Sequence, residues 1–193
     1  MMRRPGSLRV IGGELRGRRL RAPAGTQARP TADRVREAVF DILGRAIVGS
    51  TFLDAYAGTG AVGIEALSRG ASEVAFVEEN AAMAALLARN LETSGAGMGR
   101  VRVVGVDMAR ALSILEREGR RFSLVYLDPP YGGGELDRAL RLLSQSRVLA
   151  DAATVIAEHE SRQPAPVPES LRLVRTAAYG RATLSFLARD GVR

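Results

Sequence analysis

The chain has 193 residues, of which 46% are hydrophobic, enough for one folded domain with a small extension and too many for a disordered chain. It has no cysteine and a single histidine, which excludes disulfides, cysteine nucleophiles and multi-histidine metal sites, so no metal is expected. Its formal charge of +7 arises within residues 1–36, which carry ten arginines against two acidic residues. No apolar run is long enough to span a membrane, so we expect a cytoplasmic protein with no membrane partner.

The basic N-terminal segment is expected to form its own unit at residues 1–48, ahead of a larger domain at 49–193. Its concentrated charge on a near-neutral body is typical of a polyanion-binding face, although a merely solvated basic tail is the alternative. Residues 7–11 and 18–21 predict a short hairpin or loop pair. A helix should follow, with Thr31 as its N-cap and apolar residues at helical spacing as far as Ile47.

Beyond residue 50, short apolar runs alternate with helical stretches. Strands are expected at residues 51–55, 73–77, 101–106, 123–127 and 154–157, with helices at 61–69, 81–93, 108–118 and 135–144. This alternation predicts a doubly wound parallel sheet with helices on both faces. The runs 171–178 and 182–188, joined by Tyr179-Gly180-Arg181, predict a terminal antiparallel hairpin. Ligands of such sheets bind at the carboxyl ends of the strands.

The first expected strand ends in Asp54 and continues through Tyr56 and Ala57 into a glycine-rich loop. Gly58, Gly60 and Gly63 form the pattern G-x-G-x-x-G, which NAD, FAD and S-adenosylmethionine sites share. A carboxylate at this strand end favours a ligand with ammonium and sulfonium charges and would repel a pyrophosphate. A structural turn capped by Asp54 is the alternative interpretation.

Acidic residues also end the second and third expected strands. Glu78, twenty residues after Gly58, can accept hydrogen bonds from ribose hydroxyls. Asp107 can accept from an adenine amino group with Met108 beside the ring, but it can equally well be only the cap of the next helix. His159, flanked by two acids, is assigned no role.

The fourth expected strand ends in Asp128-Pro129-Pro130-Tyr131, the most specific motif of the chain. Two prolines end the strand pairing and hold the backbone rigidly, which fixes Asp128 at the mouth of the sheet. The amine of a nucleobase is a poor nucleophile because its lone pair is delocalised. A carboxylate and a backbone carbonyl that accept its two N–H groups favour a pyramidal nitrogen able to attack a sulfonium methyl. Tyr131 would stack on the extruded base.

The order of these motifs resembles that of a known family. The motifs are Val10-Ile11-Gly12-Gly13, the run 29–37 (RPTADRVRE), the run 54–60 (DAYAGTG), the run 65–71 (EALSRGA) and Asp128-Pro129-Pro130-Tyr131. From about Val10 to Phe186, the chain resembles class I, Rossmann-like amino-methyltransferases and, more narrowly, bacterial 16S ribosomal RNA guanine-N2 methyltransferases. One departure is Asn80, where the family often has Asp.

This resemblance implies a seven-stranded Rossmann-like α/β fold with a basic N-terminal extension that binds RNA. It implies methyl transfer from S-adenosylmethionine to the N2 amine of a guanine in 16S rRNA or the assembling small ribosomal subunit. A monomer is the default expectation for a chain of this size. The implied catalytic residues are Asp128, Pro129, Pro130 and Tyr131. The cofactor-binding set is Asp54, Tyr56, Ala57, Gly58, Gly60, Glu78, Asp107 and Met108. The RNA-binding set is Arg9, Arg16, Arg18, Arg19, Arg29, Thr31 and Arg34.

Other functions use some of these features. A DNA adenine or cytosine amino-methyltransferase shares Asp-Pro-Pro-Tyr but usually needs a separate recognition domain, for which the chain has no room. Enzymes that methylate a protein glutamine amide typically have Asn before the two prolines. A nicotinamide-dependent oxidoreductase would explain the glycine loop but would leave Asp54 and Asp128 without a task. A non-catalytic RNA-binding module would explain only the basic segment.

Overall fold

The computed structural model describes residues 8–23, 30–130, 132–161 and 164–189. Within them, seven strands form one sheet in the order β3-β2-β1-β4-β5-β7-β6. The strands are β1 (Thr51–Asp54), β2 (Glu73–Val77), β3 (Val101–Val104), β4 (Phe122–Leu127), β5 (Leu149–Glu160), β6 (Leu171–Tyr179) and β7 (Ala182–Arg189). The helices are α1 (Pro30–Leu43), α2 (Ala61–Ser68), α3 (Ala81–Ser94), α4 (Met108–Arg117) and α5 (Glu135–Gln145), with short 3₁₀ turns η1 (Gly44–Ile47) and η2 (Met98–Arg100).

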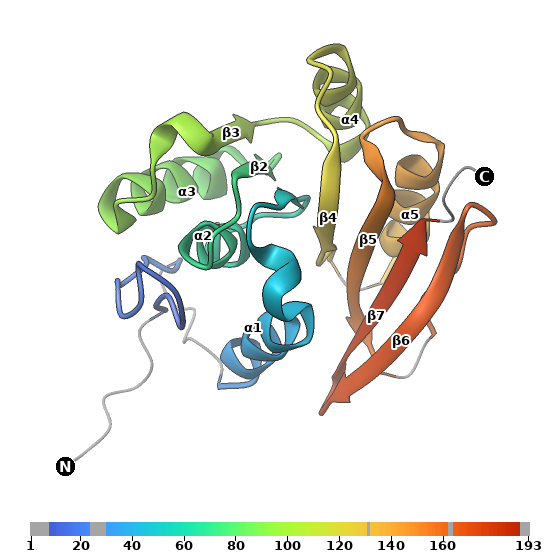
Figure 1. Ribbon diagram of the computed structural model, residues 1–193, viewed down its shortest axis with the longest axis horizontal. Helices are drawn as coiled ribbons and strands as arrows, with labels where there is room; N and C mark the ends of the chain where they lie inside the picture. The colour runs from blue at the N-terminus through green and yellow to red at the C-terminus, as the bar shows by residue number, and fades with distance from the viewer. Residues whose placement is uncertain (1–7, 24–29, 131, 162–163, 190–193) are drawn as a thin grey trace.

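The strand directions confirm the predicted mixed sheet. Strands β1 to β5 pair in parallel, and β7 pairs antiparallel with both β5 and β6 (Figure 1). Two strands differ from the prediction by two residues or more. Strand β5 extends beyond the expected 154–157 towards its end because its pairing with β7 continues to Glu160 and Ala182, and it begins earlier, at Leu149, which pairs with Phe122 of β4. Strand β3 ends at Val104, two residues before the expected end.

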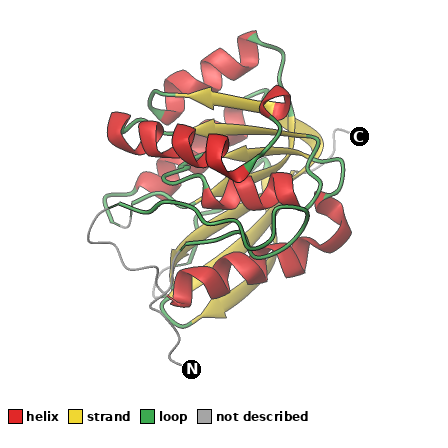
Figure 2. Cartoon of the chain, turned by 90° about the vertical axis from the view of Figure 1, so that its left-hand side faces the viewer, coloured by secondary structure: helices red, strands yellow, loops and turns green. Residues whose placement is uncertain are grey.

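Side chains of the strands alternate between two hydrophobic clusters, one on each face of the sheet. Phe52 and Phe76 face the cluster that includes α1, α2 and α3. Leu53 and Val125, one residue out of phase, face the cluster that includes α4 and α5. Helices therefore cover both faces, as the alternating pattern predicts (Figure 2). Among the described residues, none of the helices is long and apolar enough to cross a membrane.

The N-terminal loop pair packs onto this same body. A single bridge joins Arg9 to Arg19, and the N–H of Val10 donates to the carbonyl of Arg18 at 3.0 Å. Val10 and Leu20 belong to the hydrophobic cluster that α2 and α3 share with the sheet. The expected hairpin is therefore a loop pair with one bridge. The domain boundary at residue 48 stays a prediction, and apolar side chains from both sides of it meet in one cluster.

Helix α1 begins at Pro30, so the prediction of Thr31 as its N-cap is wrong. Proline suits a first helical position because an N–H there would have no partner within the helix. The α-helix ends at Leu43, and the apolar face continues through the η1 turn to the buried Ile47. Gly44, at the start of that turn, has a φ of +51°, a conformation that favours glycine.

Candidate active site

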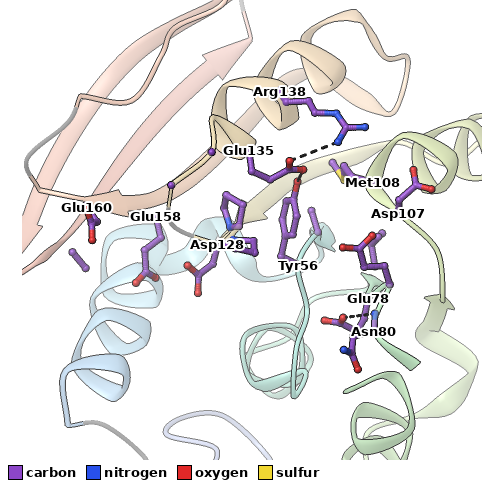
Figure 3. A pocket seen from close by; sticks show the side chains of 18 of the residues that line it. Tyr56, Glu78, Asn80, Asp107, Met108, Asp128, Glu135, Arg138, Glu158 and Glu160 are labelled. Carbon is purple, nitrogen blue, oxygen red and sulfur yellow. Dashed lines mark hydrogen bonds and ion pairs between the residues drawn. The ribbon is translucent and has the colours of Figure 1, made fainter. Parts of the chain in front are cut away.

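A cavity of about 1070 Å³ opens at the carboxyl ends of the parallel strands (Figure 3). Its walls include residues that lie within three positions of the ends of four neighbouring strands: Tyr56 after β1, Glu78 after β2, Asp107 after β3 and Asp128 after β4. Strands β1 and β4 lie side by side in the middle of the sheet. From β1 the next strands along the chain are added on one side, and from β4 on the other, so the order of the strands reverses between them. Residues that are up to 72 positions apart in the sequence therefore meet around one space, at the position where open α/β sheets bind ligands.

The glycine loop is fixed to the end of β2 by Glu78. One carboxylate oxygen of Glu78 accepts from the N–H of Gly58 at 2.7 Å, and the other accepts from the N–H of Asn80 at 2.8 Å. Gly60 has a φ of +78°, and a Cβ there would lie 2.2 Å from a methyl group of Leu87. The loop thus needs glycine both for its backbone conformation and for close packing against α3. Asn80 itself caps α3.

Asp54 lies beneath the loop and does not face the cavity. Its carboxylate is buried, with 1% of its surface exposed, and accepts from the N–H of Gly63 at 2.9 Å. Burial raises the pKa of Asp54 to about 7; the Gly63 N–H opposes this rise, and the negative charge of Glu78 adds to it. Ala57, Gly58 and Gly60 are likewise absent from the described cavity lining. Of this segment's predicted cofactor contacts, Tyr56 lines the described cavity, and the role of the others stays a prediction.

Asp107 caps α4 and also lines the cavity. Its Oδ1 accepts from the N–H of Arg110 at 3.0 Å, which caps α4, and its Oδ2 lies 3.5 Å from the Arg110 guanidinium. Its side chain also lines the cavity, together with the neighbouring Met108. Met108 is buried and packs into the cluster of α4 and α5, so its position is fixed.

The Asp-Pro-Pro segment forms the wall next to this end of the cavity. Asp128 and Pro130 are exposed to the cavity, whereas Pro129 is buried and anchors the segment. The pairing of Leu127 with Ala157 places Asp128 beside Glu158, where the parallel pairing of β4 with β5 ends (Figure 3). Surrounding protein raises the pKa of Asp128, and the negative charges of Glu158 and Asp54 raise it further. Tyr131 lies outside the described residues.

Several lining residues were not predicted from the sequence. The hydroxyl of Tyr56 donates to Glu135 at 3.0 Å, and Arg138 lies 3.6 Å from the same carboxylate. Glu158 accepts from the hydroxyl of Tyr126. Glu158 follows Ala157, the last residue of β5 that pairs with β4, much as Glu78 follows the last residue of β2, so the same rule could have found it. The remaining members of this set are Val35, Ala55, Val77, Glu79, Asn80, Val106, Gly132, Gly133, Glu160, Tyr179, Arg181 and Ala182.

The lining is strongly acidic although the whole chain is basic. Among the described lining residues, seven carboxylates stand against two arginines: Glu78, Glu79, Asp107, Asp128, Glu135, Glu158 and Glu160 against Arg138 and Arg181. Such a cavity favours cationic ligands and N–H donors and disfavours phosphate groups. Within the described part of the chain, no group of three or more histidine or acidic side chains could hold a metal ion.

The predicted RNA-binding arginines that the structure describes all lie at the surface: Arg9, Arg16, Arg18, Arg19 and Arg34 are exposed. Arg29 and the side chain of Thr31 lie outside the described residues. Arg36 differs from these arginines because it is 5% exposed and holds the loop pair in place. Its guanidinium donates to the carbonyl of Arg9 at 2.8 Å and to Asp33 at 3.0 Å.

Comparison with known proteins agrees with this architecture. A family model described as conserved hypothetical protein 95 matches residues 8–188. The ribosomal RNA small subunit methyltransferase D of Escherichia coli is 38% identical over 96% of this chain and 91% of its own length. The protein of the same name from Haemophilus influenzae is 34% identical over 91% of this chain and 90% of its own.

Solved structures show the same fold. The Escherichia coli protein YhhF superposes with a TM-score of 0.82 at 37% identity, over 97% of this chain and 100% of that one. TrmN from Thermus thermophilus, at 21% identity, shares the fold over 80% of this chain and 48% of its own, with a TM-score of 0.64. The predicted Rossmann-like methyltransferase fold is thereby confirmed, and the chain belongs to the conserved hypothetical protein 95 family and to the family of its relatives, the small subunit ribosomal RNA methyltransferases D.

Proposed function

We propose that the chain transfers a methyl group from S-adenosylmethionine to the exocyclic N2 amine of a guanine in 16S ribosomal RNA. The proposal is carried by Asp128-Pro129-Pro130, which forms a wall of an acidic cavity at the strand ends of a chain 38% identical to a protein named as a small subunit rRNA methyltransferase. We further propose that it acts in the cytoplasm as a monomer, on the rRNA or on the small ribosomal subunit during assembly.

The half of the cavity near β2 and β3 fits the proposed methyl donor. Glu78 offers carboxylate oxygens at the end of β2, where they can accept from ribose hydroxyls. Asp107 and Met108 offer an acceptor and an apolar surface for an adenine ring. When bound, the cofactor would supply a methyl group on a positively charged sulfur, which the surrounding carboxylates favour. The same carboxylates disfavour the pyrophosphate of a nicotinamide dinucleotide.

The Asp128 wall fits the proposed acceptor. The Asp128 carboxylate and a backbone carbonyl of the rigid proline segment would accept the two N–H groups of the amine, so that the nitrogen lone pair faces the methyl group. The N–CH₃ bond would form as the S–CH₃ bond breaks, and Asp128 would accept the proton that the nitrogen then loses. Tyr131, next along the chain, remains the predicted stacking partner of the extruded base.

The exposed arginines support RNA as the substrate. Five of the predicted RNA-binding arginines lie on the surface, where they can contact phosphates. If these five contact phosphate, the logarithm of RNA affinity should fall with the logarithm of salt concentration at a slope between about −3 and −5. A slope near zero would contradict this role for the N-terminal segment.

The test is methyl transfer from labelled S-adenosylmethionine to small ribosomal subunits purified from cells that lack this protein, followed by nucleoside analysis. We expect labelled N2-methylguanosine with the wild type and none with Asp128→Ala, which should still bind the cofactor. The control Asp137→Ala removes a partly exposed acid on α5 that pairs with Arg141 at 2.9 Å and lies outside the cavity lining, and it should retain activity. Labelled methyladenosine or methylcytidine would contradict the guanine assignment, and label in DNA alone would contradict the rRNA assignment.

A further inference from the structure

The cavity continues past Asp128 to the turn between β6 and β7. Beyond Glu158, its walls are formed by Glu160 at the end of β5 and by Tyr179, Arg181 and Ala182 around that turn. The strand register explains the continuity, because Ala182 of β7 pairs with Glu160 on one side and with Tyr179 on the other. This part of the wall lies at the far end from the proposed cofactor half and has no role in the proposed methyl transfer.

The turn that carries these residues is held in place by hydrogen bonds. Gly180 has a φ of +65°, as a tight hairpin turn requires. The N–H of Ser161 donates to the carbonyl of Arg181 at 3.0 Å, and its hydroxyl donates to the carbonyl of Gly180 at 3.2 Å. Thr183 in turn donates to the Ser161 hydroxyl at 2.9 Å. The backbone that presents the two side chains is therefore fixed before any ligand binds.

Tyr179 and Arg181 present an aromatic ring and a cation at the rim. Tyr179 is partly buried against the hydrophobic cluster of the α1 face, whose helix also contributes Val35 to the cavity wall. Arg181 is exposed. Within the described residues, neither the hydroxyl of Tyr179 nor the guanidinium of Arg181 has a hydrogen-bond or ion-pair partner. The other arginine of the lining, Arg138, lies beside Glu135 and is engaged with it.

The acidic lining determines which parts of an RNA strand can enter the cavity and which must stay at its rim. Asp128, Glu158 and Glu160 line the inner wall, so a neutral base with N–H donors can enter but its phosphates are repelled. The backbone of an RNA strand that delivers such a base must therefore run along the rim. There, a guanidinium can contact a phosphate and a tyrosine ring can stack on a base.

We propose that Tyr179 and Arg181 form a subsite for the nucleotide next to the methylated one, with the ring of Tyr179 stacked on its base and the guanidinium of Arg181 on its phosphate. This inference rests on the proposed function, because it requires an RNA strand at the cavity. The β6–β7 turn would then take part in substrate recognition, and changes in it should not alter binding of S-adenosylmethionine in the cofactor half of the cavity.

The test measures KM for small ribosomal subunits and Kd for S-adenosylmethionine in four variants: Tyr179→Ala, Tyr179→Phe, Arg181→Ala and Arg175→Ala. Loss of one stacked base should raise KM between about 5-fold and 150-fold in Tyr179→Ala, and Tyr179→Phe should restore most of this loss because it keeps the ring. Arg181→Ala should weaken RNA binding and reduce the salt slope by about 1. Arg175→Ala, at an exposed position of β6 outside the lining, should match the wild type.

Each outcome distinguishes this inference from the proposed function. If the wild type methylates rRNA while Tyr179→Ala and Arg181→Ala keep its KM and salt slope, the subsite is wrong and the function stands. If Tyr179→Phe loses as much as Tyr179→Ala, stacking is wrong. If the Kd for S-adenosylmethionine rises in parallel with KM, the turn shapes the cavity and is no subsite. If the wild type methylates no RNA, both proposals fail.

Discussion

The backbone N–H of Gly12 donates a hydrogen bond of 2.7 Å to the carboxylate of Glu65, which lies 53 residues further along the chain. The N–H of Ile11 donates to the other oxygen of the same carboxylate at 2.7 Å, and Arg69 adds an ion pair at 2.7 Å. Glu65 is fully buried in α2, the helix that begins at the end of the glycine loop. The basic loop pair and the proposed cofactor loop therefore share one helix as their support.

Glu65→Ala should strongly destabilise the fold. It leaves two backbone N–H groups without their acceptor and the buried Arg36 without the carboxylate 4.0 Å away. Removal of one partner of a buried ion pair typically costs about 3–5 kcal/mol. Urea unfolding measures this cost, with Glu37→Ala at an exposed position of α1 as the control. A Glu65→Ala variant as stable as Glu37→Ala would show that the loop pair does not depend on this carboxylate.

Gly13→Ala should release the loop pair from α2. Gly13 has a φ of +75°, and a Cβ there would lie 1.8 Å from the carbonyl oxygen of Ser68. Gly17→Ala is a matched control, because Gly17 has a φ of +86° but open space around it. Both variants carry the conformational cost of about 1–2 kcal/mol, and only Gly13→Ala adds the clash.

Limited trypsin digestion and thermal unfolding measure this difference. Gly13→Ala should be cleaved rapidly at the exposed arginines 16, 18 and 19 and should bind RNA more weakly, whereas Gly17→Ala should resist cleavage almost as the wild type does. Equal cleavage rates in the two variants would mean that contact with Ser68 does not hold the segment.

Asn90→Asp should weaken cofactor binding from a distance. The Asn90 amide is fully buried; it donates to the carbonyl of Thr59 in the glycine loop at 2.8 Å and to the carbonyl of Arg21 at 3.0 Å. Aspartate keeps an acceptor for the Arg21 N–H but loses both donors. Because the Thr59 carbonyl is then unpaired, we expect the Kd for S-adenosylmethionine to rise about tenfold.

The control variant for Asn90→Asp must lower the stability of the fold without changing any contact of the glycine loop. Leu143→Ala serves, since Leu143 is fully buried in the cluster of α4 and α5 on the other face of the sheet. Calorimetric titration below the melting temperature of both variants should show weaker binding in Asn90→Asp alone. Equal loss in the two variants would mean that general destabilisation, and not the Thr59 contact, sets the affinity.

The fold could be predicted because its causes are local. Phe52 and Leu53 alternate between two clusters, and glycine, proline and acidic residues mark where each strand ends. The support of the loop pair could not be predicted in this way. That Glu65 accepts from Ile11 and Gly12 depends on how α2 packs, and no periodicity in the sequence records it.

The same local signals predict only part of the site. Position at a strand end suggests that Asp54 faces a ligand, but the N–H of Gly63 in the first turn of α2 donates to its carboxylate, which is buried. Tyr179 and Arg181 were interpreted only as a turn. They join the cavity because β7 lies between β5 and β6, a strand order that the sequence pattern does not determine.

Glu158→Gln should shift the pH dependence of methyl transfer to lower pH. Asp128 must be ionised to accept both the N–H bond and the proton of the amine, so the rate should rise with pH through the pKa of Asp128. That pKa is raised by burial and by the neighbouring charge of Glu158. Glutamine removes this charge but keeps an oxygen for the Tyr126 hydroxyl, so the pKa of Asp128 should fall towards its usual range.

Single-turnover rates between about pH 5 and pH 9, with cofactor and RNA saturating, isolate this effect from changes in affinity. The acid limb of the Glu158→Gln profile should be shifted to lower pH than that of the wild type, whereas the Asp137→Ala profile should match the wild type. An unshifted limb would mean that Asp128 does not set the pH dependence. A shift to higher pH would mean that Glu158 itself takes up the proton of the amine. The variant would then have lost its proton acceptor, and this loss would outweigh the removal of a negative charge beside Asp128.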